Sequence, residues 1–154
     1  MDMRRLITKI ETKDNMILIA TFADGEVVSF DVKTLFDKYP EFKDLKSKEL
    51  FDSVRIDGVG YGISWNDELD LSSDGIYSKG KHIGKVDPDI KLLVGQAIAE
   101  ARGEKGMSQR DLASDSGIMQ AEICKIEQGK GNPTLTTLQK IAKALGKTVT
   151  SFLL

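Results

Sequence analysis

Residues 109–128 read Gln-Arg-Asp-Leu-Ala-Ser-Asp-Ser-Gly-Ile-Met-Gln-Ala-Glu-Ile-Cys-Lys-Ile-Glu-Gln, and this stretch decides the fold of the C-terminal part of the chain. Ala113 is small enough for two helices to pack closely, and Gly117 accepts the positive φ of a tight turn. Three isoleucines at helical spacing supply a buried face: Ile118, Ile123 and Ile126. This spacing predicts two short helices that cross at a turn, a helix-turn-helix.

Further helices are expected on both sides of this motif. The first runs from Lys91 to Lys105, with its inward face formed by Val94, Ala97, Ile98 and Ala101 and with Gly106 as its left-handed cap. Ser108 is a good N-cap for the next helix, and Asp111 occupies the capping-box position. The helix expected over residues 120–128 lacks such a cap, because Met119 precedes it and a methionine side chain accepts no backbone hydrogen bond.

The C-terminal segment completes an all-α domain. One helix carries five apolar residues on one face and ends at Gly146: Leu135, Leu138, Ile141, Ala142 and Leu145. A last turn, capped by Thr148, carries Val149, Phe152, Leu153 and Leu154. This apolar end exceeds what a domain of this size needs, so a two-fold dimer contact is expected there. Residues 91–154 are thus predicted to form a five-helix domain.

The flanking residues extend the motif to a family pattern. They are Arg102, Ser108-Gln109, Ile126-Glu127-Gln128-Gly129-Lys130 and Pro133. With them, residues 91–154 resemble the Cro/C1 (xenobiotic-response-element) type of helix-turn-helix regulator. The resemblance implies a lambda-repressor-like fold that binds double-stranded DNA, with a supporting salt bridge between Arg102 and Glu127. It also implies that Gln109 braces Gln120.

The helix over residues 120–128 is expected to enter the major groove of DNA. Its candidate base-contacting residues are Gln120, Ala121, Glu122 and Lys125. Glutamine can bond adenine, lysine can donate to guanine, and an alanine methyl can touch the thymine methyl. Glu122 either accepts from cytosine or excludes wrong sites. Candidate phosphate contacts lie before and after this helix: Gln109, Arg110, Lys130, Asn132 and Thr134.

Residues 1–80 are expected to form a small α+β domain with an antiparallel sheet. Short β-rich runs cover residues 6–11, 16–22, 26–31, 53–56 and 61–65, and short helices are expected over 32–39, from Ser47 through Phe51, and around Ile76-Tyr77. Asp24-Gly25 is a hairpin signal. With Trp65 and Asp70-Leu71 it resembles a small bacterial domain family of unknown function, which suggests a partner-binding role. Residues 81–90 are predicted to be a linker.

The charge is divided between the two parts of the chain. Residues 91–154 hold 9 Lys and Arg against 6 Asp and Glu, a formal charge of +3, whereas residues 1–90 hold 13 against 18 and carry −5. Basic residues are needed to neutralise phosphates. The acidic part is therefore expected to face away from DNA.

Several other features invite a functional interpretation. Gly58-Val59-Gly60-Tyr61-Gly62 lacks the spacing of a dinucleotide loop and is interpreted as a hairpin turn. His82, the only histidine, is interpreted as a solvated linker residue, and Cys124 as a half-buried helix residue rather than a redox switch. The acidic residues Asp67, Glu68, Asp70 and Asp74 are interpreted as a solvated loop with a helix cap at Ser73 or Asp74, not as a metal site.

No catalytic constellation is evident, so the sequence predicts no enzyme, no metal and no cofactor. A single cysteine forms no internal disulfide, and no apolar run approaches the roughly 20 residues of a membrane span. A cytoplasmic protein with no membrane contact is expected.

Together these features predict a sequence-specific transcriptional regulator, a homodimeric repressor. A sharper version is an antitoxin whose N-terminal domain binds a toxin protein and which represses its own operon. The alternative is a regulator whose N-terminal domain senses a small molecule.

Overall fold

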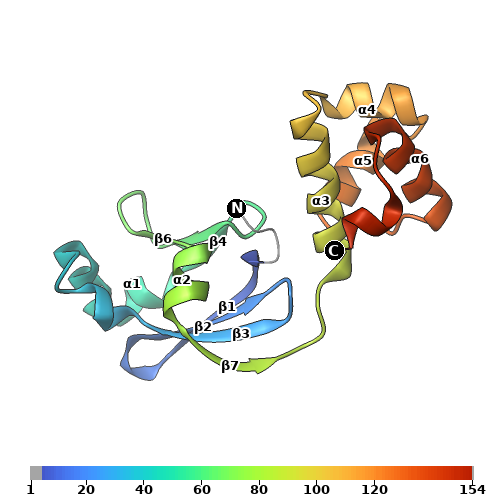
Figure 1. Ribbon diagram of the computed structural model, residues 1–154. Coiled ribbons are helices and arrows are strands. Elements are labelled where there is room, and N and C mark those ends of the chain that lie inside the picture. The colour runs from blue at the N-terminus through green and yellow to red at the C-terminus, as the bar shows by residue number, and fades with distance from the viewer. Residues whose placement is uncertain (1–4, 154) are drawn as a thin grey trace. The chain divides into compact units, whose positions relative to one another are not determined.

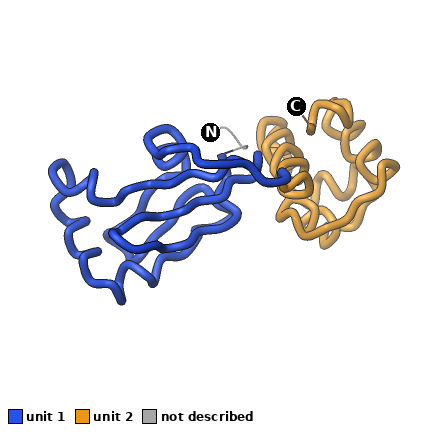
Figure 2. The backbone as a smooth tube through the Cα atoms, turned by 90° about the horizontal axis from the view of Figure 1, so that it is seen from below, with its two compact units in different colours: residues 1–88 blue, residues 89–154 orange. Residues whose placement is uncertain are grey.

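The computed structural model describes residues 5–153. The chain divides into two compact units, residues 1–88 and 89–154 (Figure 2). Each unit has its own hydrophobic core. Among the described residues, no helix combines the length and the apolar character needed to cross a bilayer.

The N-terminal unit contains two antiparallel sheets (Figure 1). The first has the strand order β1-β2-β3-β7, with β1 Ile7–Lys13, β2 Ile17–Phe22, β3 Glu26–Asp31 and β7 Lys81–Lys85. The second has the order β4-β5-β6, with β4 Arg55–Asp57, β5 Gly62–Ser64 and β6 Asp70–Ser72. The helical segments of this unit are the 3-10 turns η2 Asp14–Met16, η3 Val32–Leu35 and η4 Pro40–Lys46, and the helices α1 Lys48–Asp52 and α2 Ser73–Lys79.

Alternation along the strands builds the core of this unit. In β2 every second side chain is buried, and the same face continues on β3 with Val28 and Phe30. Helix α2 packs against both β3 and β6, with Ile76 buried. The α+β class and the antiparallel pairing predicted for this part of the chain are confirmed.

Several local predictions for this unit are corrected. Residues 81–85 are not a linker, because they form β7 and pair with β3 from Glu26↔Lys85 to Ser29↔Lys81. The helix expected over residues 32–39 is only the short η3, which ends at Leu35. The acidic stretch contains β6 rather than only a loop. The cap of α2 is Ser72, whose hydroxyl accepts from the Gly75 amide.

The C-terminal unit is built from five helical segments (Figure 1). They are α3 Ile90–Glu104, α4 Gln109–Ser116, α5 Gln120–Glu127, α6 Leu135–Leu145 and the 3-10 turn η5 Val149–Phe152. The left-handed cap predicted at Gly106 is confirmed, with a φ of +70°, and Gly146, which ends α6, has a φ of +66°. The five-helix architecture is therefore confirmed, although the Thr148 side chain does not cap the last turn as expected.

Candidate DNA interface

The turn between α4 and α5 has the geometry that its sequence predicts. The Ser108 hydroxyl accepts from the Asp111 amide at 3.0 Å, and the Asp111 carboxylate accepts from the Ser108 amide at 2.9 Å, which completes the capping box. These bonds hold the pKa of Asp111 below its ordinary value. Gly117 adopts a φ of +74°, and its amide donates to the Ala113 carbonyl at 2.9 Å. The direction in which α5 leaves α4 is thus set by the backbone.

A close backbone contact fixes α5 against α3. A Cβ atom at Gly95 would lie only 2.0 Å from the Ile126 carbonyl oxygen, so only glycine allows the two helices to come this near. The neighbouring Gln96 is buried, and its amide nitrogen donates to the Glu127 carbonyl at 2.7 Å. Neither residue was predicted from the sequence to support the site. The only available signal was a glycine in the middle of a helix, where it costs stability without a packing reason.

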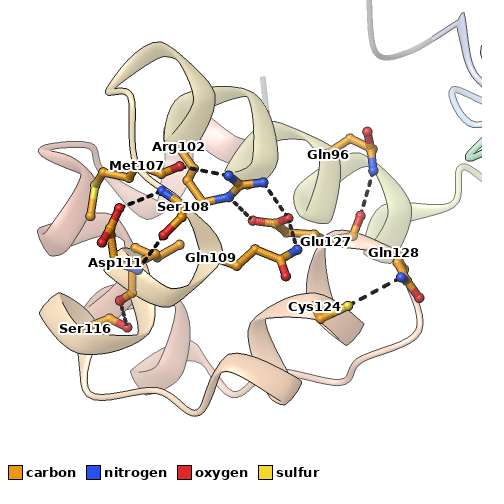
Figure 3. A network of polar contacts seen from close by, with 11 residues as sticks. Gln96, Arg102, Met107, Ser108, Gln109, Asp111, Ser116, Cys124, Glu127 and Gln128 are labelled. Atoms are coloured by element: carbon orange, nitrogen blue, oxygen red, sulfur yellow. Dashed lines mark hydrogen bonds and ion pairs between the residues drawn. The ribbon is translucent and has the colours of Figure 1, made fainter.

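A buried polar network joins α3, α4 and α5 (Figure 3). The Arg102 guanidinium forms two hydrogen bonds to the Glu127 carboxylate, at 2.7 and 3.1 Å, and a third to the Met107 carbonyl at 2.9 Å. The bonds to Glu127 raise the pKa of Arg102 above its ordinary value. The structure thus brings together the two residues that the resemblance pairs. Because the Glu127 side chain is only 6% exposed, this pair belongs to the scaffold and not to the surface.

Gln109 has a different partner from the one expected. Its amide nitrogen donates to Glu127 at 2.8 Å, whereas the resemblance implied a brace to Gln120 (Figure 3). Gln109 therefore helps to orient the Glu127 carboxylate. Gln109 was also a candidate phosphate contact, but its side chain is half-buried and this bond uses one of its donors.

Helix α5 presents one face to the core and another to solvent. Ile123 and Ile126 are 0% and 2% exposed and pack among α3, α4 and α6 residues. The four predicted base-contacting residues of α5 are all exposed: Gln120, Ala121, Glu122 and Lys125. Within residues 5–153, no hydrogen bond or ion pair engages the side chains of Gln120, Glu122 or Lys125. Their polar groups are available to a ligand that approaches this face.

The start of α5 lies where the sequence placed it. Met119 is the N-cap residue, with extended backbone geometry and no side-chain cap, and the helix begins at Gln120. The absence of a capping side chain has not moved the helix start by a residue. Met119 is 75% exposed beside the base-contact candidates.

The loop after α5 uses its backbone amides internally. The amides of Lys130 and Gly131 both donate to the Lys125 carbonyl, at 2.9 and 3.1 Å. The Thr134 hydroxyl accepts from the Thr137 amide and caps α6. These two amides are therefore not available to donate to a phosphate. The exposed side chains of Arg110, Lys130 and Asn132 remain as candidate contacts.

The apolar C-terminal end is smaller at the surface than its sequence suggested. Phe152 is buried at 4% exposure and Val149 is partly buried against the same core, whereas Leu153 is 54% exposed. Leu154 lies outside the described residues. A dimer contact in this region would thus depend on Leu153 and its surroundings.

Cys124 is half-buried, as expected, and its sulfur accepts from the Gln128 side-chain amide nitrogen at 3.4 Å (Figure 3).

The segment from Gly58 to Gly62 includes the turn between β4 and β5, which agrees with the hairpin interpretation. Among residues 5–153, no group of three or more His, Cys, Asp or Glu side chains has the geometry of a metal site.

His82 is not a linker residue but part of β7. Its Nδ1 lies 2.8 Å from Glu26 Oε2, and its Nε2 lies 2.8 Å from the Tyr77 carbonyl oxygen. Both partners are acceptors, so both contacts are hydrogen bonds only when the imidazole is doubly protonated. The Glu26 bond accordingly raises the pKa of His82. His82 therefore holds an edge strand to β3 and to α2.

Trp65 belongs to the core of the N-terminal unit rather than to a binding site. It is 4% exposed, and its Nε1 donates to the Phe51 carbonyl at 2.9 Å. Its ring stacks on Phe51 with a centroid distance of 6.5 Å. A substitution of Trp65 would therefore report on folding and not on a ligand.

Comparison with known proteins identifies both units. A family model described as helix-turn-helix matches residues 98–152, and one described as a protein of unknown function (DUF2442) matches residues 7–82. The uncharacterized HTH-type transcriptional regulator y4dJ of Sinorhizobium fredii is 41% identical over 58 residues, which cover 38% of this chain and 75% of y4dJ.

Two further similarities each cover about two fifths of the chain. The HTH-type transcriptional regulator PuuR of Escherichia coli is 39% identical over 64 residues, 42% of this chain, but the chain spans only 35% of the length of PuuR. Among solved structures, the restriction-modification controller protein C.AhdI of Aeromonas hydrophila matches with 32% identity and a TM-score of 0.40, over 40% of this chain and 94% of C.AhdI.

Proposed function

Because this chain belongs, through its C-terminal unit, to the Cro/C1-type helix-turn-helix family of DNA-binding transcriptional regulators, we propose that it is a dimeric, sequence-specific repressor. The observation that carries this proposal is the exposed face of α5. Three polar side chains project from it without an internal partner among residues 5–153, while the scaffold beneath them is closely packed and hydrogen-bonded.

Base recognition is assigned to Gln120, Ala121 and Lys125, with Glu122 as an acceptor for cytosine or a barrier to wrong sites. Gln120 opens the helix, and the N-terminal residues of a recognition helix are those that reach base edges. Each good bidentate contact contributes about 1 to 3 kcal/mol of discrimination. Specificity thus depends on very few side chains.

Phosphate contacts are assigned to the exposed side chains that flank α5: Arg110, Lys130 and Asn132. Thr134 and Gln109 also make internal hydrogen bonds, so they contribute to phosphate binding only through side-chain donors that these bonds do not use. Such contacts position the protein on DNA without selecting a sequence.

A two-fold dimer would place two copies of α5 about 34 Å apart, on successive major grooves of a palindromic site. Leu153, exposed at the end of the helical unit, is the apolar residue we assign to the contact between subunits. Leu153→Glu should lower the dimer fraction in analytical ultracentrifugation. An unchanged dimer fraction would show that the subunits contact each other through other residues.

The N-terminal unit is assigned to a protein partner. A partner toxin encoded beside this gene would make the chain an antitoxin that represses its own operon. Co-expression with the product of the adjacent gene tests this version directly. Absence of a complex, together with no relief of toxicity, would leave the regulator alone.

The proposed function is tested by selection of bound sequences from random DNA. We expect a palindromic motif with half-sites one helical turn apart, and a measured affinity that falls steeply with salt. Lys125→Ala should change the selected motif, whereas the control Lys140→Ala, on an exposed position of α6, should not. Equal affinity for the selected and a scrambled sequence would refute sequence-specific binding.

A further inference from the structure

The N-terminal unit contains a cavity of about 330 Å³ between the turns η3 and η4, the strand β6 and the helix α2. Its floor is apolar and is formed by buried side chains of the four elements β3, η3, η4 and α2: Phe30, Leu35, Phe42 and Ile76. This volume is at the lower end of the range for small-molecule sites, about 300 to 1,000 Å³. It suits one or two inserted side chains better than a complete drug-sized ligand.

The rim of the cavity is acidic. Glu41, Glu68 and Asp70 line it and are all exposed, and Lys79 is the only basic residue in the lining. In the described part of the chain, none of these three carboxylates takes part in an ion pair, whereas Glu26 and Asp52 elsewhere in the same unit are paired with lysines. Three carboxylates without an ion pair therefore line the same cavity as the apolar side chains.

An aromatic residue extends the cavity toward solvent. Tyr39 is 37% exposed, and its ring meets the ring of Phe42 edge-on at a centroid distance of 6.4 Å. Tyrosine at the edge of a pocket supplies contact area with little loss of rotamer freedom, and it is enriched where proteins bind one another.

We propose that this cavity receives a segment of a protein partner that carries a lysine or arginine next to an apolar side chain. The apolar group and the aliphatic stem of the basic residue would cover Phe42 and Ile76, and the cationic head would reach the carboxylates at the rim. The proposal deepens the proposed function, since it rests on the assignment of the N-terminal unit to a protein partner. DNA is a poor occupant of this cavity, because its phosphates would meet three carboxylates.

The test is selection of a phage-displayed random decapeptide library on the immobilised full-length chain. We expect enriched peptides that combine Arg or Lys with Leu, Phe or Trp at neighbouring positions. The variant Glu41→Gln/Glu68→Gln/Asp70→Asn should bind a selected peptide roughly tenfold more weakly than the parent, and the difference should shrink at high salt.

A matched control changes the net charge by the same amount away from the cavity. Asp37→Asn/Asp44→Asn/Glu49→Gln replaces three exposed carboxylates of the same unit that do not line the cavity, and it should bind the peptide like the parent. Chemical-shift mapping with the selected peptide should perturb amides of η4, β6 and α2. Equal weakening in both triple variants would indicate general charge attraction and overturn the proposal.

Two other outcomes would also overturn it. One is the absence of enrichment, or enrichment of acidic peptides. The other is a failure of peptide enrichment combined with an increase in Tm on addition of the free amine 4-phenylbutylamine, seen in the parent but not in the cavity variant. That result would assign the cavity to a small molecule. Affinity for selected DNA, measured on the same proteins, reports the proposed DNA function separately, because no cavity residue lies in the C-terminal unit.

Discussion

The C-terminal unit buries an ion pair between Arg102 and Glu127, whereas each described ion pair of the N-terminal unit includes an exposed side chain. Arg102, Gln109 and Gln96 all donate to Glu127 within the helical core. The core of the N-terminal unit contains instead five large aromatic side chains: Phe22, Phe30, Phe42, Phe51 and Trp65. The C-terminal core has one, Phe152.

This difference follows from what each unit must fix. Short helices with few aromatic residues can slide against one another, because apolar contacts are not directional. A hydrogen-bonded network at the crossing of α3, α4 and α5 removes that freedom and orients the exposed face of α5. Backbone pairing sets the register of the N-terminal strands, so the side chains of their core need only to fill the space between the elements. We therefore expect the two units to fail for different reasons.

The largest effect is expected from the apolar core. Phe22 is 1% exposed and meets Tyr77 edge-on at 4.9 Å, so Phe22→Ala should destabilise the N-terminal unit by about 3 to 5 kcal/mol. Urea unfolding followed by the fluorescence of Trp65, the only tryptophan, measures this unit. Affinity for selected DNA should not change. Loss of DNA binding would contradict the independence of the two cores, and Ile83→Ala, at an exposed position, serves as the control.

The second effect tests the polar network. Glu127→Ala leaves the Arg102 guanidinium without its carboxylate in a largely buried position and should cost the helical unit about 3 kcal/mol. Far-UV circular dichroism during urea unfolding should report the loss, while the transition seen by Trp65 fluorescence should stay in place.

The double variant Arg102→Met/Glu127→Leu separates charge from volume. Because no uncompensated charge remains, it should be more stable than Glu127→Ala. DNA affinity should nevertheless stay below that of the parent, since the directional bonds that orient α5 are gone. A double variant that binds DNA normally would show that packing alone orients the helix.

The same contrast explains what the sequence could predict. The capping box at Ser108 and the turn at Gly117 depend on local chemistry, so their spacing predicted them correctly. The pairing of Arg102 with Glu127 was implied by the family resemblance and not by local chemistry. Gln96 and Gly95 act through a contact with α5, about 30 residues away, and no local pattern marks them.

In the N-terminal unit the errors have one physical source. β6 has only three residues and β7 is exposed along its whole length, so neither shows the alternation that reveals a half-buried strand. Both exist because they pair with a neighbour already in place, β5 and β3 respectively. The cavity likewise joins segments that lie far apart in the sequence. Two of its acidic residues, Glu68 and Asp70, were interpreted only as part of a solvated loop.

A smaller effect separates recognition from scaffold. Lys125→Ala should lower discrimination at one base pair by about 1 to 3 kcal/mol without changing urea stability, because its side chain is exposed and makes no internal bond in the described structure. Lys130→Ala should instead weaken binding to all sequences and reduce the salt slope by about one. Anisotropy titrations on the selected site and on single-base variants distinguish them. The assignment fails if Lys125→Ala weakens all sequences equally.

A still smaller effect concerns the uncapped start of α5. Met119 already has the extended geometry of an N-cap residue and is 75% exposed, so Met119→Ser would add an acceptor with little loss of apolar contact. The helical unit should gain about 1 kcal/mol in urea unfolding. Met119→Ala is the matched control and should give no such gain. A neutral Met119→Ser would mean that the first-turn amides of α5 are already satisfied by water.

The smallest effect concerns the surface network that attaches β7. The pKa of His82 is raised by its bond to Glu26, and that of Glu26 is lowered by the same bond. The contribution of His82 to the stability of β7 pairing is complete below the ordinary histidine pKa and is lost as pH rises through the raised pKa. The contribution of Glu26 to the same stability is present above the ordinary glutamate pKa and is lost as pH falls through the lowered pKa.

Protection of the β7 amides from hydrogen exchange, corrected for the intrinsic pH dependence of exchange, should therefore be greatest between about pH 4.3 and pH 6.5. His82→Asn should remove the decline on the alkaline side, because asparagine does not titrate. Lys85, which also contacts Glu26 at 2.9 Å, remains charged throughout this range and cannot produce that decline. Protection that stays constant from about pH 5 to about pH 9 would mean that backbone pairing with β3 alone holds β7 in place. The N-terminal unit would then depend on surface charge even less than its aromatic core implies.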